Sequence, residues 1–259
     1  MRLSLSGFLF EDHTTQSLSV REFCALAQDA GYDGVELRRT QVSIETPQDA
    51  RKDVLALVKD SGLHVTCLTT RHMPTTGTKR DDFFRAYLQL CGDLRCGLLK
   101  TAGEPEWLRW AAAEAESTGV VIASNNHTGT VLETVDGTRQ HLRAVDHPNF
   151  GLLFDAMHLY AGGQDCVVCI PDFVSATRNI LVHVQRPGPT GDAGFFEHWE
   201  RTLAGSAPDA PDWPAALRTY RALSYDGPIT LVENGWPVGE RESVARRGAE
   251  ILRRLWEVD

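Results

Sequence analysis

The chain has 259 residues, of which 42% are hydrophobic and 24% charged, a composition typical of a globular protein with a large core. Its formal net charge is −9, and no run of Lys and Arg follows the spacing of a phosphate backbone, so we expect no nucleic-acid partner. No stretch approaches the roughly 20 apolar residues of a membrane helix, and we expect no membrane contact and a cytoplasmic location.

Short β-branched runs alternate with longer amphipathic segments along the whole chain. The predicted strands are residues 3–8, 34–37, 64–69, 97–101, 120–125, 151–154, 181–185 and 229–233. The predicted helices include residues 20–30, 49–61, 81–90, 106–117, 171–178, 213–223 and 242–256. Eight strand–helix units predict a parallel sheet that closes into one (β/α)8 TIM barrel, a single domain over residues 1–259. No G-x-G-x-x-G follows the first strand to favour a dinucleotide fold.

The six cysteines lie mostly inside apolar segments, where a reduced thiol packs as a small hydrophobic side chain. Cys166 and Cys169 form a C-x-x-C, which in other proteins holds half a zinc site or takes part in redox exchange. No second C-x-x-C or H-x-x-x-H accompanies it, so we expect these thiols to be packing residues.

Polar residues at the ends of the predicted strands are the candidates for function, because catalytic side chains of such barrels come from the C-terminal ends of strands. These residues are Glu36, Lys100, Asn125, His127, Asp155, His158, His183, Gln185 and Glu233. Asp155 and Glu233 are the central pair, since two carboxylates buried at strand ends need a cation or hydrogen-bond donors. Residues 187–211 are rich in Gly, Pro and Asp, and we expect them to form a loop over the barrel mouth.

Two of the charged candidates have a structural alternative. Glu36 either binds substrate or pairs with an arginine, for which the sequence offers Arg38, Arg39 and Arg71. Lys100 either binds substrate or pairs with a neighbouring carboxylate.

The other candidates depend on their depth in the barrel. His183 is expected one layer below Gln185, as a hydrogen-bonded core residue. Arg186 is a candidate for holding an anionic group of the substrate. Trp236 and Trp199 either form an apolar wall for the substrate or pack structurally.

Five segments together resemble a known family. They are GYDGVELRR (31–39), VVIASNNHTGT (120–130), NFGLLFDAMHLYAGG (149–163), LVHVQRP (181–187) and YDGPITLVENGW (225–236). The chain resembles the xylose isomerase-like barrels, which include sugar-phosphate isomerases, ketose 3-epimerases, inosose dehydratase and 3-dehydroshikimate dehydratase. The resemblance runs nearly end to end, and it implies a small-molecule substrate.

The resemblance also implies one divalent cation, held by residues that end strands five to eight. Asp155 and Glu233 match the expected Asp and Glu, whereas Asn125 stands where a Glu is expected and Gln185 where a His is expected. These four residues would form an all-oxygen set with two negative charges, which suits Mg2+ or Mn2+ better than Zn2+. The alternative is that the metal has been lost.

The altered ligands affect the mechanism that the resemblance implies. Epimerases of this family exchange the α-proton between two glutamates, of which only Glu233 is present here. His127 resembles the strand-five base of the dehydroshikimate dehydratases, and His158 matches a residue that grips substrate hydroxyls.

We expect an isomerase or epimerase that removes a proton α to the carbonyl of a sugar-like or polyhydroxy substrate. The first alternative is a dehydratase of the inosose or dehydroshikimate type that uses His127 as base. The second is a non-catalytic barrel that binds a metabolite or a partner. The sequence leaves open whether the protein is a homo-oligomer.

Overall fold

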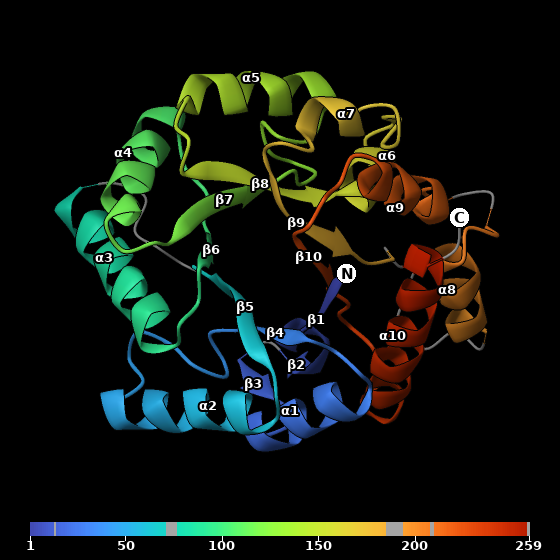
Figure 1. Cartoon of the computed structure of the whole chain (residues 1–259), viewed down its shortest axis with the longest axis horizontal. Helices are drawn as coiled ribbons and strands as arrows, with labels where there is room; N and C mark the ends of the chain where they lie inside the picture. The colour runs from blue at the N-terminus through green and yellow to red at the C-terminus, as the bar shows by residue number, and fades with distance from the viewer. Residues whose placement is uncertain (13, 71–76, 185–193, 208–209, 258–259) are drawn as a thin grey trace.

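The computed structural model describes residues 1–12, 14–70, 77–184, 194–207 and 210–257. Within these residues eight parallel strands close a barrel in the order β1-β10-β9-β8-β7-β6-β5-β4. Figure 1 shows the helices as an outer ring around these strands. The predicted (β/α)8 barrel is therefore confirmed.

Seven barrel strands begin and end within two residues of their predicted bounds, whereas β9 begins four residues before the predicted start at Leu181. The barrel strands are β1 (Arg2–Ser6), β4 (Gly34–Leu37), β5 (His64–Thr69), β6 (Leu98–Lys100), β7 (Val121–Asn125), β8 (Phe150–Asp155), β9 (Thr177–Val182) and β10 (Pro228–Leu231). The first strand is shorter than predicted, because Ser6 Oγ accepts the N–H of Phe8 and opens a 3₁₀ turn, η1 (Gly7–Phe10). A short antiparallel hairpin, β2 (Glu11–Asp12) and β3 (Thr15–Gln16), follows outside the barrel.

The helices that surround the barrel are amphipathic and bury one face against the strands. They are α1 (Val20–Asp29), α2 (Gln48–Asp60), α3 (Thr78–Asp93), α4 (Pro105–Glu116), α5 (Val135–Val145), α6 (Ala156–Ala161), α7 (Ile170–Phe173), α8 (Phe195–Leu203), α9 (Trp213–Ala222) and α10 (Arg241–Glu257), with the 3₁₀ turn η2 (Val238–Glu240) before the last. None of the described helices is long and apolar enough to cross a membrane.

Two predictions in the second half of the chain are wrong. The helix predicted over residues 171–178 is only the four-residue α7, because the β-branched run that forms β9 begins at Thr177. The predicted loop over residues 187–211 contains α8, whose buried face carries Trp199 and Leu203.

The two candidate redox residues, Cys166 and Cys169, are buried free thiols, like the other four cysteines.

A small apolar layer fills the inside of the barrel. It consists of Cys67, Leu98, Ala123, Leu153 and Leu181, with Val121 and Val232 packed against it. Side chains two apart on a strand share a face, so Leu153 and Leu181 point to the same interior as Asp155 and His183. The interior layer therefore supports the residues at the mouth of the barrel.

Truncation of this layer is expected to destabilise the fold. Leu153 is fully buried, and Leu153→Ala should lower the free energy of unfolding by about 2–5 kcal/mol through lost burial and a cavity. Val131, which is 70% exposed, provides the control, and Val131→Ala should change that free energy by less than about 0.5 kcal/mol. Urea unfolding of both variants measures the difference. Equal effects would mean that Leu153 does not support the barrel.

Candidate functional site

Asp155 lies at the end of β8, at the C-terminal mouth of the barrel, and is 2% exposed. Its backbone N–H donates to Asn126 Oδ1 (2.9 Å), and its carbonyl accepts from Asn126 Nδ2 (2.6 Å). Its Oδ1 also accepts the N–H of His158 (3.1 Å) and so caps the short helix α6. Asn126 is not among the candidates expected from the sequence, although its place beside Asn125 at the end of a strand is a usable signal.

Two imidazoles lie against the Asp155 carboxylate. His183 Nε2 is 3.0 Å from both Oδ1 and Oδ2, and His158 Nε2 is 3.7 Å from Oδ2. One ligand atom from each of the three residues lies within 4.8 Å of the other two. The sequence analysis placed His183 in the core below the site, whereas the structure brings it into contact with Asp155.

A third imidazole, His127, continues this row at the exposed edge of the mouth. The rings of His127 and His158 have centroids 3.8 Å apart, and those of His158 and His183 are 5.1 Å apart. His127 Nδ1 lies 2.7 Å from the carbonyl oxygen of Thr128. Because a carbonyl can only accept, Nδ1 is the donor, and Nε2 makes no hydrogen bond to the described residues.

Burial and charge oppose each other in this group. Burial raises the pKa of Asp155, but His183 and His158 outweigh it and hold that pKa below its usual value. Burial lowers the pKa of His183, but the Asp155 carboxylate outweighs it and raises that pKa. For His158 burial is decisive and lowers the pKa to about 4. At neutral pH Asp155 is therefore an anion, and His158 is a neutral imidazole.

Glu233 is not among the three residues whose ligand atoms lie within 4.8 Å of one another, and its place in one ligand set with Asp155 stays a prediction. Its Oε1 accepts from the N–H of Val184 (2.9 Å) and from Trp199 Nε1 (2.7 Å), and its Oε2 accepts from Trp236 Nε1 (3.2 Å). The preceding residue, Val232, packs against the interior layer, whereas Glu233 is hydrogen-bonded to Trp199 of α8 and to Trp236 after β10. Burial raises its pKa, and His183 and the N–H donors act against that rise.

Trp236, which donates to Glu233, is buried among other aromatic side chains. This side chain is 1% exposed and packs with Trp199, Phe195 and Phe196. Of the two alternatives for Trp236, the structure shows packing together with a hydrogen bond to Glu233.

The predicted substrate residue Glu36 is paired with an arginine. It is 1% exposed and accepts from Ser6 Oγ (3.2 Å), Thr69 Oγ1 (3.5 Å) and Arg38 Nη1 (3.3 Å). Arg38 is in turn bonded to Glu11 (3.2 Å). Of the alternatives for Glu36, the ion pair with Arg38 is present.

Lys100 and Asn125 end the neighbouring strands β6 and β7, and both are half-buried. Lys100 forms no ion pair with any carboxylate in the described ranges. Burial is the largest influence on the pKa values of His158 and His183, and the positive charge of Lys100 also acts to lower both. Lys100 therefore lies near the Asp155 group. The remaining candidates, Gln185 and Arg186, lie outside the described residues.

The Asp155 group fits a divalent transition metal. It offers one carboxylate and two imidazole nitrogens, a mixed set that suits Mn2+, Co2+, Fe2+ or Zn2+ better than the all-oxygen set expected from the sequence. Thr128 Oγ1 lies 3.2 Å from His158 Nδ1 and orients that ring with its Nε2 toward Asp155.

Proteins that are similar to this chain share its barrel fold. A family model described as a xylose isomerase-like TIM barrel matches residues 24–255. The rhizopine catabolism protein MocC of Rhizobium meliloti is 28% identical over 155 residues, which are 53% of this chain and 44% of that protein. The chain thus spans less than half the length of this curated relative.

Solved structures with this fold are similar over nearly their whole length. A D-psicose 3-epimerase has 13% identity and a TM-score of 0.76, with 100% of each chain covered. The probable 3-DHS dehydratase AsbF from Bacillus anthracis has 15% identity and a TM-score of 0.74, with 98% of this chain and 99% of that chain covered. The 3-keto-D-glucoside 4-epimerase YcjR from E. coli has 14% identity and a TM-score of 0.71, with 98% of each chain covered. At these identities the likeness shows the fold alone.

The two adjacent asparagines provide a test of how Asp155 is held. Asn126→Ala leaves the buried N–H and carbonyl of Asp155 without partners and should lower the free energy of unfolding by about 1–3 kcal/mol. Asn125, for which the described residues provide no side-chain hydrogen bond, is the matched control, and Asn125→Ala should cost less than about 0.5 kcal/mol. Chemical denaturation compares the two variants. A larger loss for Asn125→Ala would contradict this account of the site.

Proposed function

The chain belongs to the xylose isomerase-like TIM barrel family, and on this premise we propose that it is an isomerase or epimerase of a sugar-like or polyhydroxy carbonyl compound. The proposed reaction begins by removal of a proton α to the carbonyl. The observation that carries this proposal is the row of three imidazoles beside the buried Asp155 carboxylate at the mouth of the barrel.

We assign the base to His127. Its Nδ1 is fixed by the Thr128 carbonyl, and its Nε2 is a free acceptor on the exposed side of the mouth. Imidazole is the side chain that most often serves as a general base, because its neutral form offers one nitrogen that can accept a proton. Glu233 is a weaker candidate than the sequence suggested, because three N–H donors already occupy its oxygens.

Asp155, His158 and His183 would hold the divalent cation that the family resemblance implies. When bound, such a cation supplies positive charge beside the substrate oxygens. Lys100 provides a second positive charge near this place and would hold the carbonyl or a hydroxyl oxygen. An arrangement of this kind stabilises the negative charge that develops when the α-proton leaves.

The fate of the proton decides between isomerase and dehydratase. With Asn125 and Glu233 both unsuited to a two-carboxylate exchange, a single base must take and return the proton. Return to a neighbouring carbon gives an isomer, and transfer to a β-hydroxyl expels water. The rings of His127 and His158 are in contact, so a proton taken up by His127 stays next to the proposed substrate site. The same base could therefore return that proton to carbon or pass it to a β-hydroxyl, and the dehydratase is the second candidate.

Solvent exchange tests the proposed chemistry directly. The protein should incorporate deuterium α to the carbonyl of at least one member of a panel of ketoses, ketose phosphates, inososes and dehydroshikimate in D2O, as measured by NMR. A product that differs from the substrate's composition only by the incorporated deuterium indicates an isomer or epimer, and a product that has lost water indicates the dehydratase. Binding of panel members without exchange would contradict the enzyme proposal and favour a metabolite-binding barrel.

The base is tested on the same exchange. His127→Gln should lower the exchange rate by a factor of about 10² to 10⁴, because this is the usual contribution of a general base. His147, which lies in the loop before β8, is the matched control, and His147→Gln should keep the parent rate. Near-normal exchange by His127→Gln would remove His127 from the mechanism.

Metal titration distinguishes the proposed ligand set of Asp155, His158 and His183 from the set expected from the sequence, which contains Glu233. Calorimetric titration with Mn2+ should show binding by the parent protein, a loss of at least tenfold in affinity in Asp155→Asn and in His183→Gln, and less than threefold change in Glu233→Gln. A loss in Glu233→Gln equal to that in Asp155→Asn would return Glu233 to the ligand set. Absence of binding by the parent protein would overturn the metal part of the proposal.

A further inference from the structure

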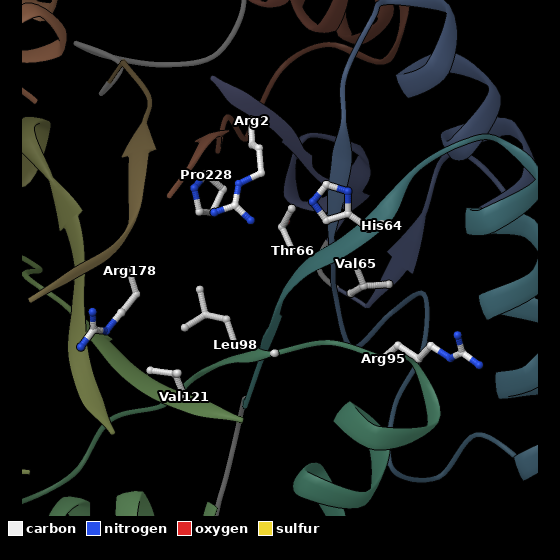
Figure 2. A pocket seen from close by; sticks show the side chains of 10 residues that line it. Arg2, His64, Val65, Thr66, Arg95, Leu98, Val121, Arg178 and Pro228 are labelled. Atoms are coloured by element: carbon white, nitrogen blue, oxygen red, sulfur yellow. The ribbon is translucent and has the colours of Figure 1, made fainter. Parts of the chain in front are cut away.

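A cavity lies at the floor of the barrel, at the opposite end from Asp155. Its volume is about 310 Å³, and its lining comes from the first residues of the strands or the turns before them. Figure 2 shows Arg2 and His64 from β1 and β5, with Leu98 and Val121 from β6 and β7, around the cavity, while the guanidinium groups of Arg178, from β9, and of Arg95 extend toward its rim. A pocket of this size accommodates a small metabolite.

The cavity is cationic, although the chain has a formal net charge of −9. Its lining includes Arg2, Arg95, Arg178 and His64 but no Asp or Glu. None of the three arginines forms an ion pair with a carboxylate in the part of the chain that the structure describes. Their positive charges are therefore not neutralised by the fold.

The hydrogen bonds of these arginines go to main-chain carbonyls. Arg2 donates twice to the carbonyl of Asp226 (3.2 and 2.6 Å). Arg178 donates over longer distances to the carbonyls of Ser175 (3.3 Å) and Pro148 (3.4 Å), and its Nε is buried without a partner. Such contacts orient a guanidinium and leave its charge and some of its N–H groups for a ligand.

Two β-bulges direct side chains to this cavity. The register passes from Val35↔Val65 to Glu36↔Cys67, so Thr66 is an extra residue in β5. It passes from Leu152↔Thr177 to Leu153↔Asn179, so Arg178 is an extra residue in β9. Bulges of this kind re-aim a side chain and often lie beside functional sites. Both extra residues line the same cavity.

A glycine beside each bulge keeps room for the re-aimed side chain. A Cβ at Gly151 would lie 2.4 Å from Cγ of Arg178, and a Cβ at Gly34 would lie 2.6 Å from Cγ2 of Thr66. Neither distance is compatible with normal van der Waals contact. Glycine at these two positions therefore permits the observed positions of Thr66 and Arg178.

The charges of Arg2 and Arg178 also act on the pKa of the same residue, Tyr225. Burial raises the pKa of the Tyr225 phenol, and both arginines act against that rise, whereas Asp226 adds to it. The two guanidinium groups thus lie near one buried ring. Asp226 is exposed, and its contact with Arg2 is through its carbonyl.

We propose that this floor cavity binds a small organic anion with at least two negative charges, a phosphate monoester or a polycarboxylate. Guanidinium groups bind the paired oxygens of either anion through two parallel hydrogen bonds. Leu98 and Val121 provide an apolar wall for the carbon part of the ligand. The site is separate from the proposed catalytic mouth and does not depend on the reaction there.

Calorimetric titration at fixed ionic strength tests this site with two probes, inorganic pyrophosphate and citrate. The full chain, freed of metal on a chelating resin, should bind at least one probe with a stoichiometry of one. Preference for pyrophosphate assigns the phosphate class, and preference for citrate assigns the polycarboxylate class. Binding of neither probe overturns the proposal.

Variants locate the bound anion. Arg95→Gln and Arg178→Gln should each weaken binding at least fivefold, and Gly151→Ala should weaken it while it retains every charge. Arg95 is exposed and has no side-chain partner in the described residues, so its replacement tests the site without a risk to folding. Arg218→Gln, on the exposed face of α9, is the control and should keep the parent affinity.

A last comparison separates the floor from the mouth. Asp155→Asn and Lys100→Gln change the mouth of the barrel and should leave the affinity for the anion unchanged. Loss of anion binding in Lys100→Gln with no change in Arg95→Gln and Arg178→Gln would place the anion at the mouth and overturn the proposal.

Discussion

The buried carboxylate of Asp155 is the constraint on which the site depends. A carboxylate that is 2% exposed must be paired or hydrogen-bonded, because an isolated charge in the barrel would cost several kcal/mol. Asn126 holds its main chain from the end of β7, and His183 reaches both carboxylate oxygens from the end of β9. Three neighbouring strands must therefore end at matched heights. His158 enters the group because Asp155 caps the helix that carries it.

The second buried carboxylate, Glu233, satisfies the same requirement in a different way. Asp155 is paired with imidazoles and its pKa is lowered, whereas Glu233 accepts from two indoles and a backbone N–H and its pKa is raised. Neutral N–H donors compensate burial less than a charged partner does. Glu233 thereby attaches α8, through Trp199, to the ends of β9 and β10. This contact links the segment after β9 to the barrel.

The alternation of strands and helices was predictable from the sequence because apolar residues recur with different periods in strands and in helices. The class of the fold followed from eight repeats of the strand–helix unit. The exact end of a strand was not predictable, and one residue of error changes the face of a side chain. The last strand is predicted to end at Glu233 but ends at Leu231, so Glu233 lies after the strand, where its hydrogen bonds rather than strand alternation fix its side chain. The same limit applies to His183, whose contact with Asp155 depends on the register between β8 and β9. The bulge at Arg178 shifts that register, and no sequence pattern indicates it.

The interior layer separates two chemically different ends of one barrel. Leu153 and Leu181 lie two residues before Asp155 and His183 on their strands, and Leu98 lies two residues before Lys100 while it also lines the floor cavity. This apolar layer lies between the Asp155 carboxylate at the mouth and the arginines at the floor. It also joins the two ends mechanically, because packed side chains transmit displacement. Truncation of a residue in this layer therefore removes packing next to both ends, whereas a substitution at one rim removes contacts next to that rim.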